Sequence, residues 1–123
     1  MSSTKIAFAM CGSFCTFSKA IPQAQLLKEK GYDIIPIMSQ NASATDTRFG
    51  LAKDFIEKLE KISEKKLINS IKDAEPLGPK NMCDAMVIAP CTGNTLAKLC
   101  NGIKDTSVTM AAKSLLRVGK PII

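Results

Sequence analysis

The sequence contains no histidine and no tryptophan, and it has one tyrosine and two arginines. Without histidine, a zinc site would have to rest on thiolates alone, and the side chain that most often acts as a general base is absent. The scarcity of aromatic side chains and arginine leaves little with which to stack on or grip nucleic-acid bases. We therefore predict no metal site and no nucleic-acid partner.

Paired cysteine motifs and long apolar runs are also absent. The five cysteines form an odd set without a C-x-x-C motif, which favours reduced thiols over a disulfide framework. No apolar run approaches the roughly 20 residues of a membrane helix, and residues 1–5 are too short and polar for a signal peptide. We expect a soluble cytoplasmic protein with no membrane contact.

The 123 residues carry a net charge of +6 and are 46% hydrophobic, enough for one domain with a single core. Lysine and glutamate alternate over residues 53–66, as on the solvated face of a helix, and do not form a basic stripe. A slightly basic surface of this kind favours small anionic ligands.

Residues 84–95 (DAMVIAPCTGNT) combine a buried strand with a polar loop. Residues 86–89 are continuously apolar, as in a parallel strand covered on both faces, and Pro90 ends the pairing. Thr92 or Asn94 can cap the helix that follows, whose apolar residues recur at helical spacing until Asn101-Gly102 stops it. Such a strand–loop–helix unit favours phosphate binding, although the same pattern also suits an ordinary connection with a good cap.

The same order of elements occurs at the start of the chain. A strand over residues 5–10 (KIAFAM) leads into a loop in which Gly12 permits close backbone approach and Ser13 adds a hydroxyl group. Neither G-x-G-x-x-G nor the P-loop motif is present, which disfavours NAD and ATP as the primary ligand and leaves a mononucleotide such as FMN open.

A second strand is predicted over residues 33–38 (DIIPIM), followed by hydroxyl and amide groups at residues 39–43. Because Pro36 cannot donate to a ladder, this strand should lie near an edge of the sheet. The next helix should begin near Thr45 and carry an apolar stripe toward the sheet. Arg48 would then lie in its first turn, where it either reaches an anionic ligand or is simply exposed.

The remainder completes an α/β pattern with a parallel sheet. Residues 66–82 predict a loop with a short strand near residues 67–71, and residues 106–118 predict a helix with apolar positions directed inward. Residues 119–123 begin another parallel strand. We expect one domain over residues 1–123 that forms the front portion of a longer one.

Four motifs together resemble one known family: residues 12–17 (GSFCTF), 45–50 (TDTRFG), 74–79 (AEPLGP) and 89–95 (APCTGNT). The whole chain resembles the flavoprotein superfamily of FMN-binding Cys decarboxylases and flavin prenyltransferases, and these motifs resemble the dipicolinate synthase B-subunit family within it. The decarboxylase branch uses a histidine that this chain lacks, so decarboxylation of that type is not expected.

The resemblance implies a Rossmann-like (flavodoxin-like) three-layer fold, FMN at the carboxyl ends of the strands and a trimer-based homo-oligomer. It implies a flavin-dependent oxidoreductase subunit that oxidises a dihydrodipicolinate-type precursor to dipicolinate during sporulation, in the mother cell, together with a dipicolinate synthase A subunit. The alternatives are a non-enzymatic flavin-binding or regulatory subunit and a flavin prenyltransferase-like enzyme.

Within this fold we place the FMN phosphate among four residues of the first two loops: Gly12, Ser13, Phe14 and Ser39. The ribityl chain and ring edge would lie along the third loop: Cys91, Thr92, Gly93, Asn94 and Thr95. We expect the thiol at position 91 to be a ring-edge contact and not a nucleophile.

The substrate of this family carries carboxylates, and we expect Arg48 to bind one of them with two hydrogen bonds. Lys98 is the weaker candidate for that role. The sequence identifies no catalytic residue.

Overall fold

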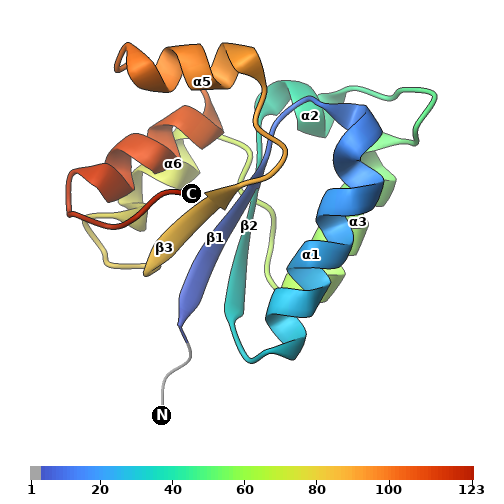
Figure 1. The fold of residues 1–123 in the computed structure, drawn as a ribbon, viewed down its shortest axis with the longest axis horizontal. Coiled ribbons are helices and arrows are strands. Elements are labelled where there is room, and N and C mark those ends of the chain that lie inside the picture. Colours follow the sequence, from blue (N-terminus) through green and yellow to red (C-terminus); the bar gives the residue numbers. More distant parts are fainter. Residues whose placement is uncertain (1–3) are drawn as a thin grey trace.

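The computed structural model describes residues 4–123 and consists of a parallel β-sheet between two layers of helices (Figure 1). The sheet has three strands, β1 (Lys5–Met10), β2 (Asp33–Met38) and β3 (Ala85–Ile88), in the order β2-β1-β3. Both strand pairs are parallel. The α/β class and the parallel sheet predicted from the sequence are confirmed.

Helices cover both faces of this sheet. Figure 1 shows α1 (Phe17–Glu29) and α3 (Ala52–Ser63) on one side and α6 (Ser107–Leu116) on the other, with α2 (Gln40–Ala44) and α5 (Gly93–Cys100) near the ends of the strands. The remaining elements are α4 (Ile71–Ala74) and the 3₁₀ turns η1 (Phe14–Thr16) and η2 (Glu75–Leu77). No helix among residues 4–123 has the length and apolarity needed to cross a membrane.

Two apolar clusters form the core, one on each face of the sheet. Because successive side chains of a strand point to opposite faces, Phe8 of β1 joins the cluster under α1 and α3, whereas Ala7 joins the cluster under α6. In the first cluster the rings of Phe17 and Phe55 meet edge to face, 4.9 Å apart. Leu115 of α6 is fully buried in the second. The central strand β1 therefore belongs to both clusters.

Single bridges continue the sheet beyond β2 and β3. The strand expected near residues 67–71 is reduced to a parallel bridge between Ile37 and Ile68, and the strand expected over residues 119–123 to a bridge between Met86 and Ile122. The amide of Ile123 also donates to the carbonyl of Met86, at 2.8 Å. The segment after α6 thus lies beside β3.

Pro36 lies in β2, one of the two outer strands of the three-stranded sheet, as its missing N–H predicted. The amides of Asp33 and Ser39 donate toward β1, to Thr4 and Met10, whereas the amide of Met38 donates outward to Ile68. Backbone groups alternate along a strand, so the nitrogen of Pro36 also faces outward. The ladder with β1 therefore loses no hydrogen bond.

The helix expected near Thr45 begins later. The α3 helix starts at Ala52, whose amide donates to the carboxylate of Asp46 at 2.8 Å. Residues 47 and 50 are hydrogen-bonded to each other and close a tight turn. Asp46, one of the polar residues 45–47, therefore caps α3 from the other side of this turn. Arg48 is consequently in a loop and not in the first helical turn. Residues 40–44, expected as loop, form the short helix α2.

Two apolar faces differ from the sequence-based expectation. In α5 only Thr95 is buried, whereas Leu96 is 57% exposed and Ile103, just after the helix, is 44% exposed. In α6, Leu116 is 59% exposed, because each helical residue is rotated by about 100° from the one before it and Leu115 already occupies the inner position. Within the described residues, Leu99 is therefore the part of this apolar stripe that packs against the core, in the cluster under α6, whereas Leu96 remains exposed.

Candidate functional site

The loops that follow the three strands converge on one pocket of about 510 Å³. Ligand pockets in proteins typically measure about 300–1,000 Å³. Most of the residues that line it are polar: Cys11, Gly12, Ser39, Gln40, Asn41, Thr92, Asn94, Thr95, Lys98, Asp105 and Thr106. Five residues expected to contact FMN thus lie together, Gly12, Ser39, Thr92, Asn94 and Thr95, and they are joined by Lys98, the weaker candidate for a substrate carboxylate.

The first loop passes close to its neighbours at this edge. The amide of Cys11 donates to the carbonyl of Pro90 at 3.0 Å, which ties the loop after β1 to the loop after β3. A Cβ atom at Gly12 would lie 3.2 Å from the side-chain nitrogen of Asn41. Glycine therefore lets this loop run beside α2 and leaves its backbone open to the pocket.

Ser39 ends β2 and caps α2. Its hydroxyl oxygen accepts a hydrogen bond from the amide of Ala42 at 3.1 Å, and its own amide donates to Met10 at 3.0 Å. A serine hydroxyl has one proton to donate in addition to its acceptor sites, and no protein acceptor takes that proton among residues 4–123. Ser39 can therefore donate one further hydrogen bond into the pocket.

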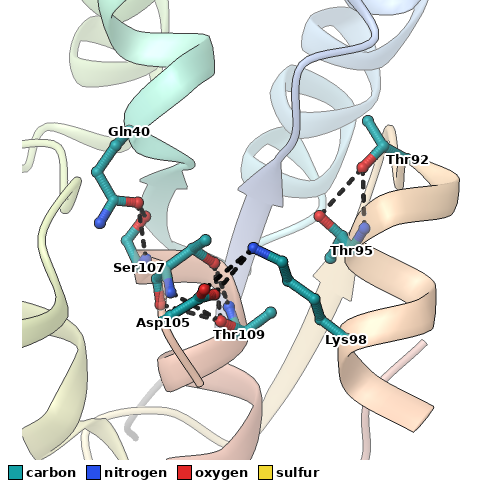
Figure 2. A network of polar contacts seen from close by, with 8 residues as sticks. Gln40, Thr92, Thr95, Lys98, Asp105, Ser107 and Thr109 are labelled. Carbon is teal, nitrogen blue, oxygen red and sulfur yellow. Dashed lines mark hydrogen bonds and ion pairs between the residues drawn. The ribbon is translucent and has the colours of Figure 1, made fainter. Parts of the chain in front are cut away.

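Thr92 is the N-cap of α5, which resolves the choice between Thr92 and Asn94. Its hydroxyl oxygen accepts from the amide of Thr95 at 3.1 Å, and the two threonine hydroxyls are also 3.1 Å apart (Figure 2). The first amides of a helix have no partner within it, and the helix dipole places positive potential at this end. The start of α5 therefore presents hydrogen-bond donors to the pocket.

Two charged residues that line the pocket, Lys98 and Asp105, form an ion pair with each other. The ammonium group of Lys98, on α5, lies 3.0 and 3.2 Å from the two carboxylate oxygens of Asp105, in the segment before α6 (Figure 2). The Lys98 side chain is 23% exposed and that of Asp105 is 60% exposed. Among the described residues Lys98 is the only cation that lines this pocket, so an anion bound there would compete with Asp105 for it.

A hydrogen-bond network joins α2 to α6 next to the pocket. The side-chain oxygen of Gln40 accepts from the amide of Ser107 at 3.0 Å (Figure 2). The buried hydroxyl of Ser107 donates to the carbonyl of Met38. Thr106 and Thr109 form a capping box at the start of α6. These contacts hold the polar residues of three segments in fixed positions.

Sequence reasoning selected none of five lining residues as ligand contacts: Cys11, Gln40, Asn41, Asp105 and Thr106. The Thr-x-x-Thr spacing at residues 106–109 is a recognisable cap signal, but nothing local shows that this cap faces Gln40, 67 residues earlier in the chain.

The other residues selected from the sequence lie outside the pocket lining. Ser13, Cys91 and Gly93 are next to lining residues in the chain. Phe14 is two residues from Gly12, and its ring packs 5.3 Å from that of Phe17. The guanidinium of Arg48 lies over the ring of its neighbour Phe49, 5.0 Å from the centroid. The ligand contacts expected of these residues stay predictions.

Cys91 has the features of a neutral thiol. Although Cys91 is an exposed residue, partial burial of its thiol, and to a smaller degree the nearby Cys11, raise the pKa of that thiol. Its sulfur lies 3.6 Å from the carbonyl oxygen of Thr92, a weak hydrogen bond for which the thiol is the donor. Nucleophilic cysteines instead have lowered pKa values. Among residues 4–123, no cluster of three or more histidine, cysteine or acidic residues could hold a metal ion.

Comparison with known proteins finds close relatives among dipicolinate synthase B subunits. Over 119 residues the chain is 42% identical to the B subunit of dipicolinate synthase from Bacillus subtilis (strain 168), a match that covers 97% of this chain and 60% of the relative. The crystal structure of the corresponding B subunit from Bacillus halodurans C superposes with a TM-score of 0.85 at 40% identity, covering 98% of this chain and 62% of that one. The chain thus spans about three fifths of the length of both relatives and is homologous to them.

More distant structures share the fold. DmrB from Burkholderia xenovorans, solved in complex with FMN and described as a cubic protein cage for redox transfer, superposes with a TM-score of 0.69 at 24% identity, covering 98% of this chain and 65% of that one. The family model described as Flavoprotein matches residues 1–123. Because that match spans the whole sequence, the chain belongs to the flavoprotein family.

Proposed function

We propose that this chain is an FMN-binding B subunit of dipicolinate synthase, which oxidises a dihydrodipicolinate-type precursor to dipicolinate together with an A subunit. The observation that carries the proposal is the convergence of three strand-end loops on one polar pocket, in a chain 42% identical to such a protein. The proposed setting is the cytoplasm of the mother cell of a spore former.

The donor set of the pocket fits a phosphate-bearing ligand. The open backbone at Gly12, the free hydroxyl proton of Ser39 and the first amides of α5 are hydrogen-bond donors, and Lys98 adds a positive charge. Phosphate oxygens only accept hydrogen bonds, so they match such donors. We place the FMN phosphate among Gly12, Ser13, Phe14 and Ser39.

The third loop would hold the ribityl chain and the ring edge, along Cys91, Thr92, Gly93, Asn94 and Thr95. FMN, when bound, supplies an acceptor for the hydride that the oxidation removes. The protein's part is to orient the substrate beside that loop and to exclude water. The neutral Cys91 thiol offers a small, uncharged contact at this position.

Two cations are candidates for a substrate carboxylate. Arg48, the candidate favoured by the sequence, lies in the loop between α2 and α3 and stacks on Phe49. Lys98 lines the pocket and would have to exchange Asp105 for the ligand. We retain Arg48 as the proposed substrate ligand. Arg48→Ala, assayed with the A subunit, should then reduce kcat/KM by roughly tenfold or more with unchanged flavin content.

The exposed apolar side of α5 supports the proposed assembly. Leu96, in the first half of α5, is 57% exposed, and Ile103, just after the C-terminal end of the helix, is 44% exposed. Large apolar side chains gathered on one surface commonly mark contacts between protein chains. We propose a trimer-based homo-oligomer in which this side of α5 is covered, and which associates with the A subunit.

A flavin titration tests the placement of the phosphate. The double variant Ser13→Ala, Ser39→Ala should bind FMN roughly tenfold or more weakly, because charged phosphate oxygens lose two donors. Ser18→Ala, at an exposed position on α1, is the matched control and should bind as the parent does. Unchanged affinity in the double variant, measured by quenching of flavin fluorescence, would rule the placement out.

One observation favours a second candidate, a non-enzymatic flavin-binding or regulatory subunit. Within residues 4–123, Lys98 and Asp105 are the only charged residues lining the pocket, and they are paired with each other. In that case the A subunit performs the chemistry. The flavin absorbance of the loaded protein separates the two functions: dipicolinate should perturb it if the substrate binds beside FMN, and should leave it unchanged if this chain only supports its partner.

A further inference from the structure

A second concave site lies beside α6 and is separate from the pocket at the strand ends. Its volume is about 360 Å³, and it shares no lining residue with the first pocket. The walls come from η2 and the segment after it, from the stretch before α6, and from the outer side of α6 with its C-terminal end. This volume lies within the range of about 300–1,000 Å³ typical of small-molecule sites.

Three cations face this cavity: Lys104, Lys113 and Arg117. Lys113 and Arg117 are four residues apart and so lie on the same side of α6. Both are near the C-terminal end of the helix, where the helix dipole stabilises positive charge. Lys104 precedes α6, so its positive charge is not stabilised by the C-terminal end of the helix dipole. The dipole therefore does not explain why Lys104 lies beside Lys113 and Arg117.

No ion pair neutralises this group within the part of the chain that the structure describes. The salt bridges among residues 4–123 use Lys28, Lys65 and Lys98. Of the described residues, Glu75 is the single carboxylate in the cavity lining, and it pairs with none of the three cations. The cavity therefore has an excess of positive charge.

The cations repel one another across the cavity. The charge of Lys104 lowers the pKa of the Lys113 ammonium group, with smaller contributions from burial and from Arg117. The repulsion between like charges that are held close together in a concave site decreases when an anion binds between them. A ligand with two negative charges would reduce this repulsion more than a monoanion would.

The rest of the lining is apolar or already satisfied. Met110 and Pro79 contribute apolar surface, and the Ser114 hydroxyl donates to the carbonyl of Glu75 at 2.6 Å while it accepts from the amide of Gly78 at 2.7 Å. We propose that this cavity binds a small organic dianion, a phosphate monoester or a dicarboxylate, whose anionic groups contact Lys104, Lys113 and Arg117 and whose apolar body lies against Met110.

An NMR titration of the ¹⁵N-labelled chain tests the proposal with two probes, phenyl phosphate and phthalate, and with benzyl alcohol as the neutral reference. Saturable shifts should occur at amides of residues 104–118 with at least one dianion and not with benzyl alcohol. Lys113→Gln should weaken that binding by roughly tenfold or more, because a charged hydrogen bond is lost. Lys19→Gln, which removes the same charge at an exposed position of α1, should change it less than about twofold.

The probes also separate the two sources of the dianion. Binding of phenyl phosphate alone assigns the cavity to phosphate monoesters, and binding of phthalate alone assigns it to dicarboxylates. As a second readout, the pKa of Lys113, followed through its side-chain nitrogen, should rise when the probe is bound. Absence of shifts with both dianions, equal weakening by Lys19→Gln, or shifts confined to the strand-end pocket would overturn the proposal. None of these results depends on FMN binding.

Discussion

Gly78 lies where no side chain can fit. A Cβ atom there would come within 2.0 Å of the backbone oxygen of Ser114, so α6 and the segment after η2 would have to separate. We expect Gly78→Ala to lower the free energy of unfolding by about 3 kcal/mol or more. Gly93→Ala is the matched control, since nothing lies within 4 Å of its Cβ position, and should change stability by less than about 0.5 kcal/mol. Equal effects in urea denaturation would contradict this packing.

Cys83 makes stability depend on pH in the alkaline range. The residue is 1% exposed, and its burial, followed by the charge of Asp84, raises the pKa of its thiol from 9.0 to about 11. The unfolded chain therefore loses this proton before the folded protein does. The protonated thiol's contribution to the free energy of unfolding is fully present below about pH 9. It is lost as the pH rises toward about 11, which lowers the free energy of unfolding by roughly 1–3 kcal/mol.

Comparison of the parent with Cys83→Ala isolates this contribution from the titration of lysines. The two pH values to compare are about 8 and about 10.5, on either side of the ordinary thiol pKa of 9.0. Between them, the unfolding free energy of the parent should fall further than that of the variant. Identical pH profiles would show that the thiol ionises equally in the folded and unfolded chains.

At the scale of elements, the cap of α3 is supplied from outside the helix. The Asp46 carboxylate accepts from the amide of Ala52, six residues later, across the turn that carries Arg48. We expect Asp46→Ala to destabilise the protein by about 1 kcal/mol, and Asp46→Asn, which keeps an acceptor but loses the charge, by less. Unchanged thermal stability of Asp46→Ala would show that α3 starts without this cap.

At the scale of the whole molecule, β1 joins the two core clusters into one folding unit. Leu59 and Leu115 are fully buried on opposite faces, and replacing either by alanine should cost about 2–5 kcal/mol. Tyr32, the only tyrosine, packs against the cluster of Leu59. In Leu115→Ala, tyrosine fluorescence and far-ultraviolet circular dichroism should therefore show one shared, shifted transition. If Tyr32 kept the parent's midpoint, the two faces would be independent.

Much of the architecture could be predicted from the sequence because its signals are local. Continuous apolar runs, Pro36 and Pro90, and the cap residue Thr92 give the strands, the edge position of β2 and the start of α5. The parallel sheet then brings the strand ends to one edge, which is why Gly12 and Ser39 share a pocket with Thr92.

Contacts between distant segments were decided only by the tertiary structure. The pair Gln40–Ser107 joins residues that are 67 positions apart and depends on how α2 and α6 are arranged at that edge, which no local pattern encodes. The same holds for α5. Its periodicity determines that one side is apolar, but what that side contacts depends on the space around it, and within residues 4–123 the sheet is already covered there by α6.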